Sequence, residues 1–367
     1  MHFQGFSLLG DIFSYMQPGY LVAAIEFTSV SVALVVLLIY SKLYFRKRAH
    51  LYHSAVRNKL ENRISEMLVS DQEDNQIPPD LQDIVRTPAG RQLATAELVN
   101  CRNNFTGAVA ETVVRLYELL GLKKHSLERL ASTQWHIKAG GIRELYLMDQ
   151  TDTLKKIYRY TNNSNELVRM EAQIGILHMS GFDGLRFLDV VSYPITEWQQ
   201  IKLLEQLKHS PKSDKLAAAV PKWLDSPNAT ITRFALKLAD EYQLYSLRTE
   251  VSGCLEHKEA AVRKQAVHTL VKIADEQTSA LLISLFPRET RDNQLAILQE
   301  LEKIAAEELS PFLLSVLEEK DNGIKLAAAK VLASMNGPGM DALAEKGRLQ
   351  PVPYEEIYQH VKSAYRL

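Results

Sequence analysis

Residues able to perform catalysis are present in the chain, but none of them falls into a spacing that an active site needs. The sequence has no glycine-rich phosphate loop, no His-Glu-x-x-His zinc motif and no Gly-x-Ser-x-Gly nucleophile turn. Its ten histidines are scattered, and no Cys or His pair has metal-ligand spacing. We therefore predict no catalytic, cofactor-binding or metal-binding residue. A site assembled from distant repeats is the alternative.

The remaining reactive or charged residues have structural interpretations. Cys101 and Cys254 are far apart, and we expect both to be free thiols, buried as small apolar side chains. The basic cluster in residues 155–159 is typical of a solvated helix face. His268 is interpreted in the same way, as a helix-face residue.

An apolar run near the N-terminus is long enough to cross a membrane. Residues 20–40 would form a helix of about 31 Å at roughly 1.5 Å per residue. Positive charge follows the run instead of preceding it, which predicts an uncleaved transmembrane helix over 20–41. Because basic flanks stay inside, we expect a single-pass inner (plasma) membrane protein with its N-terminus outside. A buried core helix is the alternative. The flank, which could also contact anionic lipid, is formed by Lys42, Arg46, Lys47 and Arg48.

Glu26 is the one acidic residue inside this run. It lies about 9 Å from the outer boundary by helix rise, so it could reach the headgroup region or be protonated. Alternatively, it faces a polar or basic group on another membrane helix, with Ser29 and Ala33 on the same side.

Three further segments accompany the span. We expect residues 1–19 to form an extracytoplasmic segment, whose helical apolar spacing over 3–16 fits either an interfacial helix or an ordered tail packed against a partner. Residues 42–69 continue as a juxtamembrane helix. The acidic, proline-containing stretch 70–86 predicts a linker.

The rest of the chain is organised by a repeat of about 31 residues, clearest in Val262-Arg263-Lys264-Gln265-Ala266. Small residues mostly follow the anchor by three positions and apolar residues by seven, which is the stripe of a buried helix face. The anchors are Gly107, Lys138, Arg169, Gln200, Thr232, Arg263, Gln294 and Lys325.

A capping position precedes each anchor by four residues. Six of the eight are Asn, Asp or Thr, whose side chains accept hydrogen bonds from the first turn of a helix. The sequence therefore predicts eight helices that begin in register. The predicted caps are Asn103, Gln134, Asn165, Thr196, Asn228, Glu259, Thr290 and Asp321.

A second, shorter apolar segment lies between these helices, as in Leu185 and Leu188, so each unit should contain two helices. Such small pairs must stack on their neighbours to bury their apolar faces. Over roughly residues 90–336 the pattern resembles the HEAT-repeat family, particularly the short HEAT-like repeats of bacterial proteins. Its best matches are Val168-Arg169-Met170-Glu171-Ala172, Val262-Arg263-Lys264-Gln265-Ala266 and Ile324-Lys325-Leu326-Ala327-Ala328.

The resemblance implies an all-α, right-handed α-α superhelix, a HEAT-like solenoid, over 87–336. The period is shorter than that of long eukaryotic HEAT or armadillo units, and tetratricopeptide signatures are absent, so ankyrin and tetratricopeptide folds are weaker rivals. Gln200 and Gln294 depart from the family pattern, so their repeats are degenerate.

The family also implies a role for the basic anchors. They typically bridge neighbouring units by pairing with an acid or a carbonyl, so we expect a structural role here. The alternative is a charged ladder that faces a partner. The anchors concerned are Lys138, Arg169, Arg263 and Lys325.

Charge counts make nucleic acid an unlikely partner. Residues 87–367 contain 35 basic and 35 acidic residues, whereas a nucleic-acid-binding solenoid is expected to present a basic stripe. The dense basic patch of the chain is the juxtamembrane one.

These observations predict a non-enzymatic, membrane-anchored scaffold whose cytoplasmic repeats bind a protein partner, as part of an envelope or signalling assembly. The alternative is a HEAT-like enzyme that resembles bilin lyases or glycosylases. Residues 337–367 should cap the last repeat, with an exposed partner-binding helix as the alternative.

Overall fold

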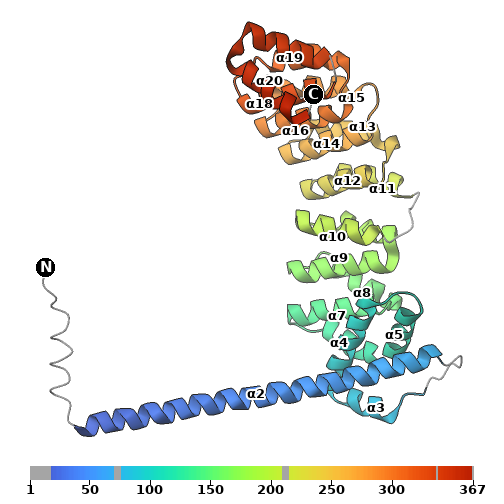
Figure 1. Cartoon of the computed structure of the whole chain (residues 1–367). Helices are drawn as coiled ribbons and strands as arrows, with labels where there is room; N and C mark the ends of the chain where they lie inside the picture. Colours follow the sequence, from blue (N-terminus) through green and yellow to red (C-terminus); the bar gives the residue numbers. More distant parts are fainter. Residues whose placement is uncertain (1–17, 70–75, 209–214, 336–337, 366–367) are drawn as a thin grey trace. The chain divides into compact units, whose positions relative to one another are not determined.

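The computed structural model describes residues 18–69, 76–208, 215–335 and 338–365 (Figure 1). Within these ranges the chain forms nineteen α-helices and no strand, so the all-α prediction is confirmed. The chain divides into two compact units, with the boundary between Leu127 and Glu128.

The first unit begins with one long helix, α2, which spans Pro18–Val69. The stretches expected as a transmembrane helix and a juxtamembrane helix are thus one continuous helix. Its apolar part is long enough to cross a membrane, and none of the most apolar window is buried. Phe27 and Leu37 are 74% and 66% exposed, which does not fit a buried core helix.

The last third of α2 packs in the first unit against α4 (Pro88–Asn104) and α5 (Ala108–Leu119). Val56 and Leu60 lie one turn apart on one face and are buried there. One helix therefore has an exposed apolar part and a part that belongs to a folded core.

The linker expected over residues 70–86 is shorter than predicted, because residues 79–86 form the helix α3 (Pro79–Arg86). Proline suits the first turn of a helix, where the amide hydrogen has no intrahelical acceptor. Leu81 and Ile84 then lie on one side and are buried. Residues 70–75 and the segment 3–16 lie outside the described residues.

The second unit is built from helices that lie side by side in chain order (Figure 1). The longer helices pack in succession, α7 on α9, α9 on α10, α12 on α14, α14 on α16 and α16 on α18. Their bounds are α7 Trp135–Leu147, α9 Glu166–Ser180, α10 Glu197–Leu207, α12 Ala229–Glu241, α14 Ala260–Lys272, α16 Arg291–Leu301 and α18 Asn322–Ser334.

The repeat register is confirmed at seven of the eight predicted caps, which directly precede these seven helices. Asn165, Thr196, Asn228 and Asp321 accept backbone hydrogen bonds through their side chains. The prediction for Asn103 is wrong. Thr87 caps α4, which continues through that position as far as Asn104.

The second helical segment of each repeat is shorter and less regular than the first. Leu185 and Leu188 are buried as expected, but they lie in a 3₁₀ helix, η2 (Gly181–Asp189). The other short segments include α6 Leu122–Leu130, η1 Thr151–Thr153, α8 Leu154–Tyr158, α11 Lys215–Leu224, η3 Tyr245–Leu247, α13 Arg248–Gly253, η4 Cys254–Glu256, α15 Thr278–Leu285, η5 Phe286–Arg288, η6 Glu302–Ile304, η7 Glu307–Leu309 and α17 Ser310–Val316.

The described C-terminal residues form two helices, α19 (Pro338–Leu349) and α20 (Pro351–Tyr365). α20 packs on α18, and Tyr354 and Val361 are buried in the same core as the repeats. Tyr354 also donates a hydrogen bond of 2.7 Å to the carbonyl oxygen of Leu317.

Candidate partner-binding surface

Groups with intrinsic reactivity are held in unreactive settings. Cys101 and Cys254 are free and buried, as expected. Burial raises the pKa of both thiols, that of Cys254 to about 11, so neither is a ready nucleophile at neutral pH. Across the described ranges, no three His, Cys, Asp or Glu residues are grouped as metal ligands.

The anchor Arg263 joins two repeats. Its Nε and Nη2 atoms donate to the carboxylate of Glu289, over 2.5 and 2.9 Å. Its Nη1 donates to the carbonyl oxygen of His257, in the loop before its own helix. Burial opposes ionisation of Glu289, but hydrogen bonds from Arg263 and Asn293 outweigh it and lower the pKa of that carboxyl.

The other basic anchors also reach the following repeat. Arg169 donates to the carbonyl oxygen of Asn163 over 2.6 Å, and its guanidinium lies 4.4 Å from the ring centroid of Tyr193. Lys138 lies over Tyr160, and Lys325 over Tyr354 in α20. These contacts support a structural role for the basic anchors.

The two glutamine anchors make comparable contacts through neutral groups. Gln200 is fully buried, and its Nε2 donates to the carbonyl oxygens of Ile195 and Thr230, over 3.2 and 3.1 Å. Gln294 donates to the carbonyl oxygen of Phe286 over 3.0 Å. The repeats that we interpreted as degenerate therefore keep a contact from the anchor to the segment before its own helix, through an amide in place of a charged group.

His268 is more than a helix-face residue, since it connects three helices. Its Nδ1 lies 2.8 Å from Glu300 on α16, and its Nε2 lies 3.2 Å from Asp240 on α12. Hydrogen bonds to Asp240 and Glu300 outweigh the effect of burial and raise the pKa of His268 to about 9. The imidazole is therefore a cation at neutral pH.

A groove of about 500 Å³ lies beside His268 and is lined by residues of α10, α12, α14 and α16. We call it the polar groove. Arg233 on α12 pairs with Glu197 on α10 across one end of it. Its lining residues are Glu197, Arg233, Ala261, Lys264, Gln265, His268, Ala296, Gln299 and Glu300.

Large apolar side chains are exposed on the corresponding parts of α7, α9 and α10. Trp135 and Leu167 are 47% and 44% exposed, and Trp198 and Ile201 are 55% and 58% exposed. We call these four residues the apolar patch. Since large exposed apolar side chains on adjacent elements commonly mark interaction sites, the patch and the polar groove together form the candidate partner-binding surface.

The repeat register contains a signal that could have found this surface. Leu167 and Trp198 lie two positions before their anchors, whereas Ile201, Arg233 and Lys264 lie one position after theirs. These offsets lie on the side of each helix away from the buried stripe. The buried positions of the repeat were predicted, whereas these exposed positions were not.

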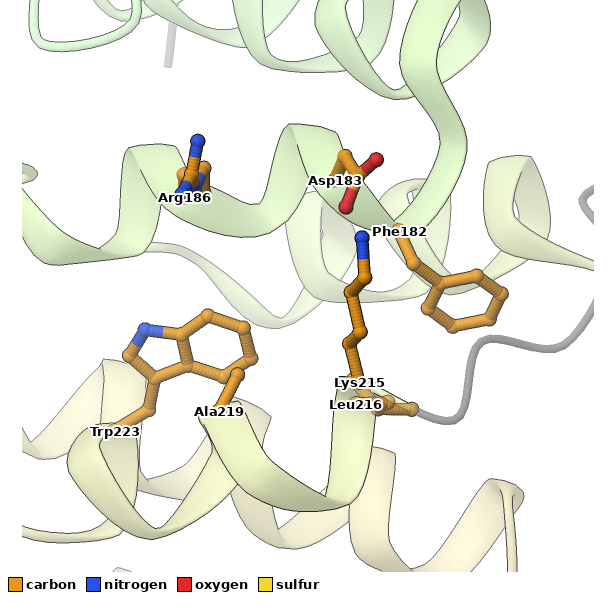
Figure 2. A pocket seen from close by; sticks show the side chains of 7 residues that line it. All are labelled: Phe182, Asp183, Arg186, Lys215, Leu216, Ala219 and Trp223. Atoms are coloured by element: carbon orange, nitrogen blue, oxygen red, sulfur yellow. The ribbon is translucent and has the colours of Figure 1, made fainter.

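A second cavity, of about 340 Å³, lies between η2 and α11 (Figure 2). Figure 2 shows Lys215 extending toward Asp183, with Trp223 on the other side. Trp223 is buried, and its indole nitrogen donates to Asp189 over 2.8 Å. This cavity therefore combines oppositely charged side chains with a core tryptophan, and no catalytic arrangement emerges from it.

The residues predicted for membrane contacts all lie on exposed positions of α2. Glu26 is exposed in the apolar stretch, while Thr28 and Ser31 bond to backbone carbonyls of their own helix. Within the described residues, none of the basic flank side chains forms a salt bridge. That flank comprises Lys42, Arg46, Lys47 and Arg48.

No family model matches the chain, and no curated protein matches it either. Solved structures that are similar include two crystal structures of engineered proteins from a structural genomics consortium. The first is 14% identical, with a TM-score of 0.37, and covers 77% of this chain and 88% of its own. The second is 11% identical, with a TM-score of 0.25, and covers 70% and 96%. At these values the similarity carries no functional argument.

Proposed function

We propose that this protein is a membrane-anchored scaffold with HEAT-like repeats, which binds a protein partner on the candidate partner-binding surface. The observation that carries the proposal is the apolar patch. Trp198 and Ile201 are more than half exposed although they lie on a helix whose opposite side is fully buried. A partner that covers them would remove this apolar area from water.

The exposed apolar part of α2 supports the membrane anchor. We place the N-terminus outside and the repeats in the cytoplasm, because the basic flank follows the apolar stretch. Tethering raises the effective concentration of the repeats near membrane-bound partners. Resistance to carbonate extraction and protease cleavage of an N-terminal tag from the outside test this topology. Release by carbonate would contradict the anchor.

The binding function is tested by site-specific crosslinking in intact membranes. A photoreactive amino acid replaces Trp198 in one variant, and Lys155, on the exposed face of α8, in a matched control. We expect a discrete crosslinked protein from position 198 and none from position 155. Identical products from both positions, or none from position 198, would contradict a specific surface.

A further inference from the structure

The chemistry of the candidate surface narrows the kind of partner, if the proposed binding function holds. The apolar patch and the polar groove meet at α10, which provides Trp198 and Ile201 to the first and Glu197 to the second. α10 is joined to α12 by the hydrogen bond from Gln200 to Thr230 and by the ion pair between Glu197 and Arg233. The two parts therefore form one surface.

Cations outnumber carboxylates in and beside the groove. Arg233, Lys264 and His268 line the groove and Lys237 and Lys303 lie beside it, together with the carboxylates of Glu197, Asp240 and Glu300. Within the described residues, neither Lys237 nor Lys264 has a salt-bridge partner. Burial first, and then the proximity of Arg233, lowers the pKa of Lys237. A carboxylate from outside would relieve this excess of positive charge.

The surface is also elongated along the chain order of the helices. Its central part, from Leu167 on α9 to Lys264 on α14, covers three steps between neighbouring helices at roughly 8–10 Å each. An extended peptide covers that distance with about eight or nine residues at roughly 3.3 Å per residue. A small anion would contact only one end of it.

From this geometry we infer that the surface binds an extended acidic segment of a partner protein, with a bulky apolar side chain on the patch and carboxylates at Lys237 and Lys264. Apolar burial supplies affinity, and the charges fix the position of the segment along the groove. A partner bound through hydrophobic contacts alone would leave Lys237 and Lys264 without a carboxylate.

Phage display of random ten-residue peptides on the full-length protein in nanodiscs tests this inference. We expect enrichment of peptides that combine several Asp or Glu residues with a bulky apolar residue. Synthesised peptides should lose at least tenfold in affinity with Trp198→Ala and with Lys237→Glu/Lys264→Glu. The matched charge control, Lys155→Glu/Lys156→Glu on α8, should bind them normally. Thermal unfolding of each variant separates lost binding from lost folding, with Lys264→Glu alone as the milder variant.

Three outcomes would overturn the inference: enrichment of neutral or basic peptides, an equal loss of affinity in the charge control, or stronger competition by a ten-nucleotide oligothymidylate. Failure to enrich any peptide would overturn it as well. The proposed binding function fails separately, when the crosslinker at position 198 captures no protein. If it captures a partner that lacks an acidic segment, only the inference fails.

Discussion

The repeats around Arg263 and Gln200 solve the same problem with different chemistry. Both anchors take up carbonyl oxygens of the loop before their own helix, and both reach the next repeat. Arg263 does so with a charge that requires the buried carboxylate of Glu289, whereas Gln200 uses a neutral amide. These two anchors thus share the contact to the loop, and a charged group is only one way of making it.

The largest expected effect on stability comes from breaking the ion pair between Arg263 and Glu289. Arg263→Ala leaves the carboxylate of Glu289, whose side chain is 1% exposed, without its cation. Removing one member of a buried ion pair costs about 3–5 kcal/mol. We expect the thermal midpoint, followed by circular dichroism, to fall by on the order of 10 °C.

A double variant checks the cause of that loss. Arg263→Ala/Glu289→Gln removes the orphaned charge and should recover part of the stability. If the stability loss of the double variant equals the sum of the losses of Arg263→Ala and Glu289→Gln, the two side chains are not coupled.

The neutral hydrogen bonds of Gln200 should contribute less to stability than the ion pair of Arg263. Gln200→Leu keeps a similar volume but removes two hydrogen bonds, to the carbonyl oxygens of Ile195 and Thr230. Oε1 of Gln200 has no partner among the described residues, so its removal offsets part of the cost. We expect a loss of about 1–2 kcal/mol in the free energy of unfolding, measured by urea denaturation. A loss equal to that of Arg263→Ala would contradict the comparison.

The smallest expected effect on stability concerns His268, which is partly exposed and pairs with Asp240 and Glu300. Its pKa is raised to about 9 in the folded protein, so its stabilising contribution is complete below the unfolded value of about 6.5 and is lost as the pH rises through 9. Because its side chain is 38% exposed, solvent screening limits the contribution to roughly 1 kcal/mol.

The thermal midpoints of wild type and His268→Gln should therefore differ more at pH 6 than above pH 9. Gln200→Leu provides the control, because neither residue titrates. The decrease that it causes in the thermal midpoint should therefore not follow the titration of His268. If His268→Gln lowers the thermal midpoint by the same amount at every pH, the charged imidazole does not stabilise these contacts.

Sequence reasoning reached the starts of the helices because capping is local. Asn165, Asn228 and Asp321 act within three residues of their own position, so spacing alone reveals them. The same reasoning was wrong at Asn103, because Thr87 and Pro88 start an earlier helix that continues through it. The α3 helix was not predicted either, because its eight residues offer only a short pattern of prolines, three apolar residues and end charges.

The candidate surface was less accessible to sequence reasoning. Trp198 is an unremarkable apolar residue until its neighbours are known to leave it exposed. His268 meets Asp240 and Glu300, which lie 28 and 32 residues away along the chain. No local pattern marks such a cluster.

The sequence by itself determined the seven longer repeat helices, their repeat length and the apolar stretch of α2, since each depends on periodicity, capping or length. Only the tertiary structure decided which side chains meet across repeats, which charges are paired and which apolar residues remain in contact with water. The physical reason is that burial and charge pairing depend on neighbours brought together by packing, whereas helix formation depends mainly on residues within a few positions.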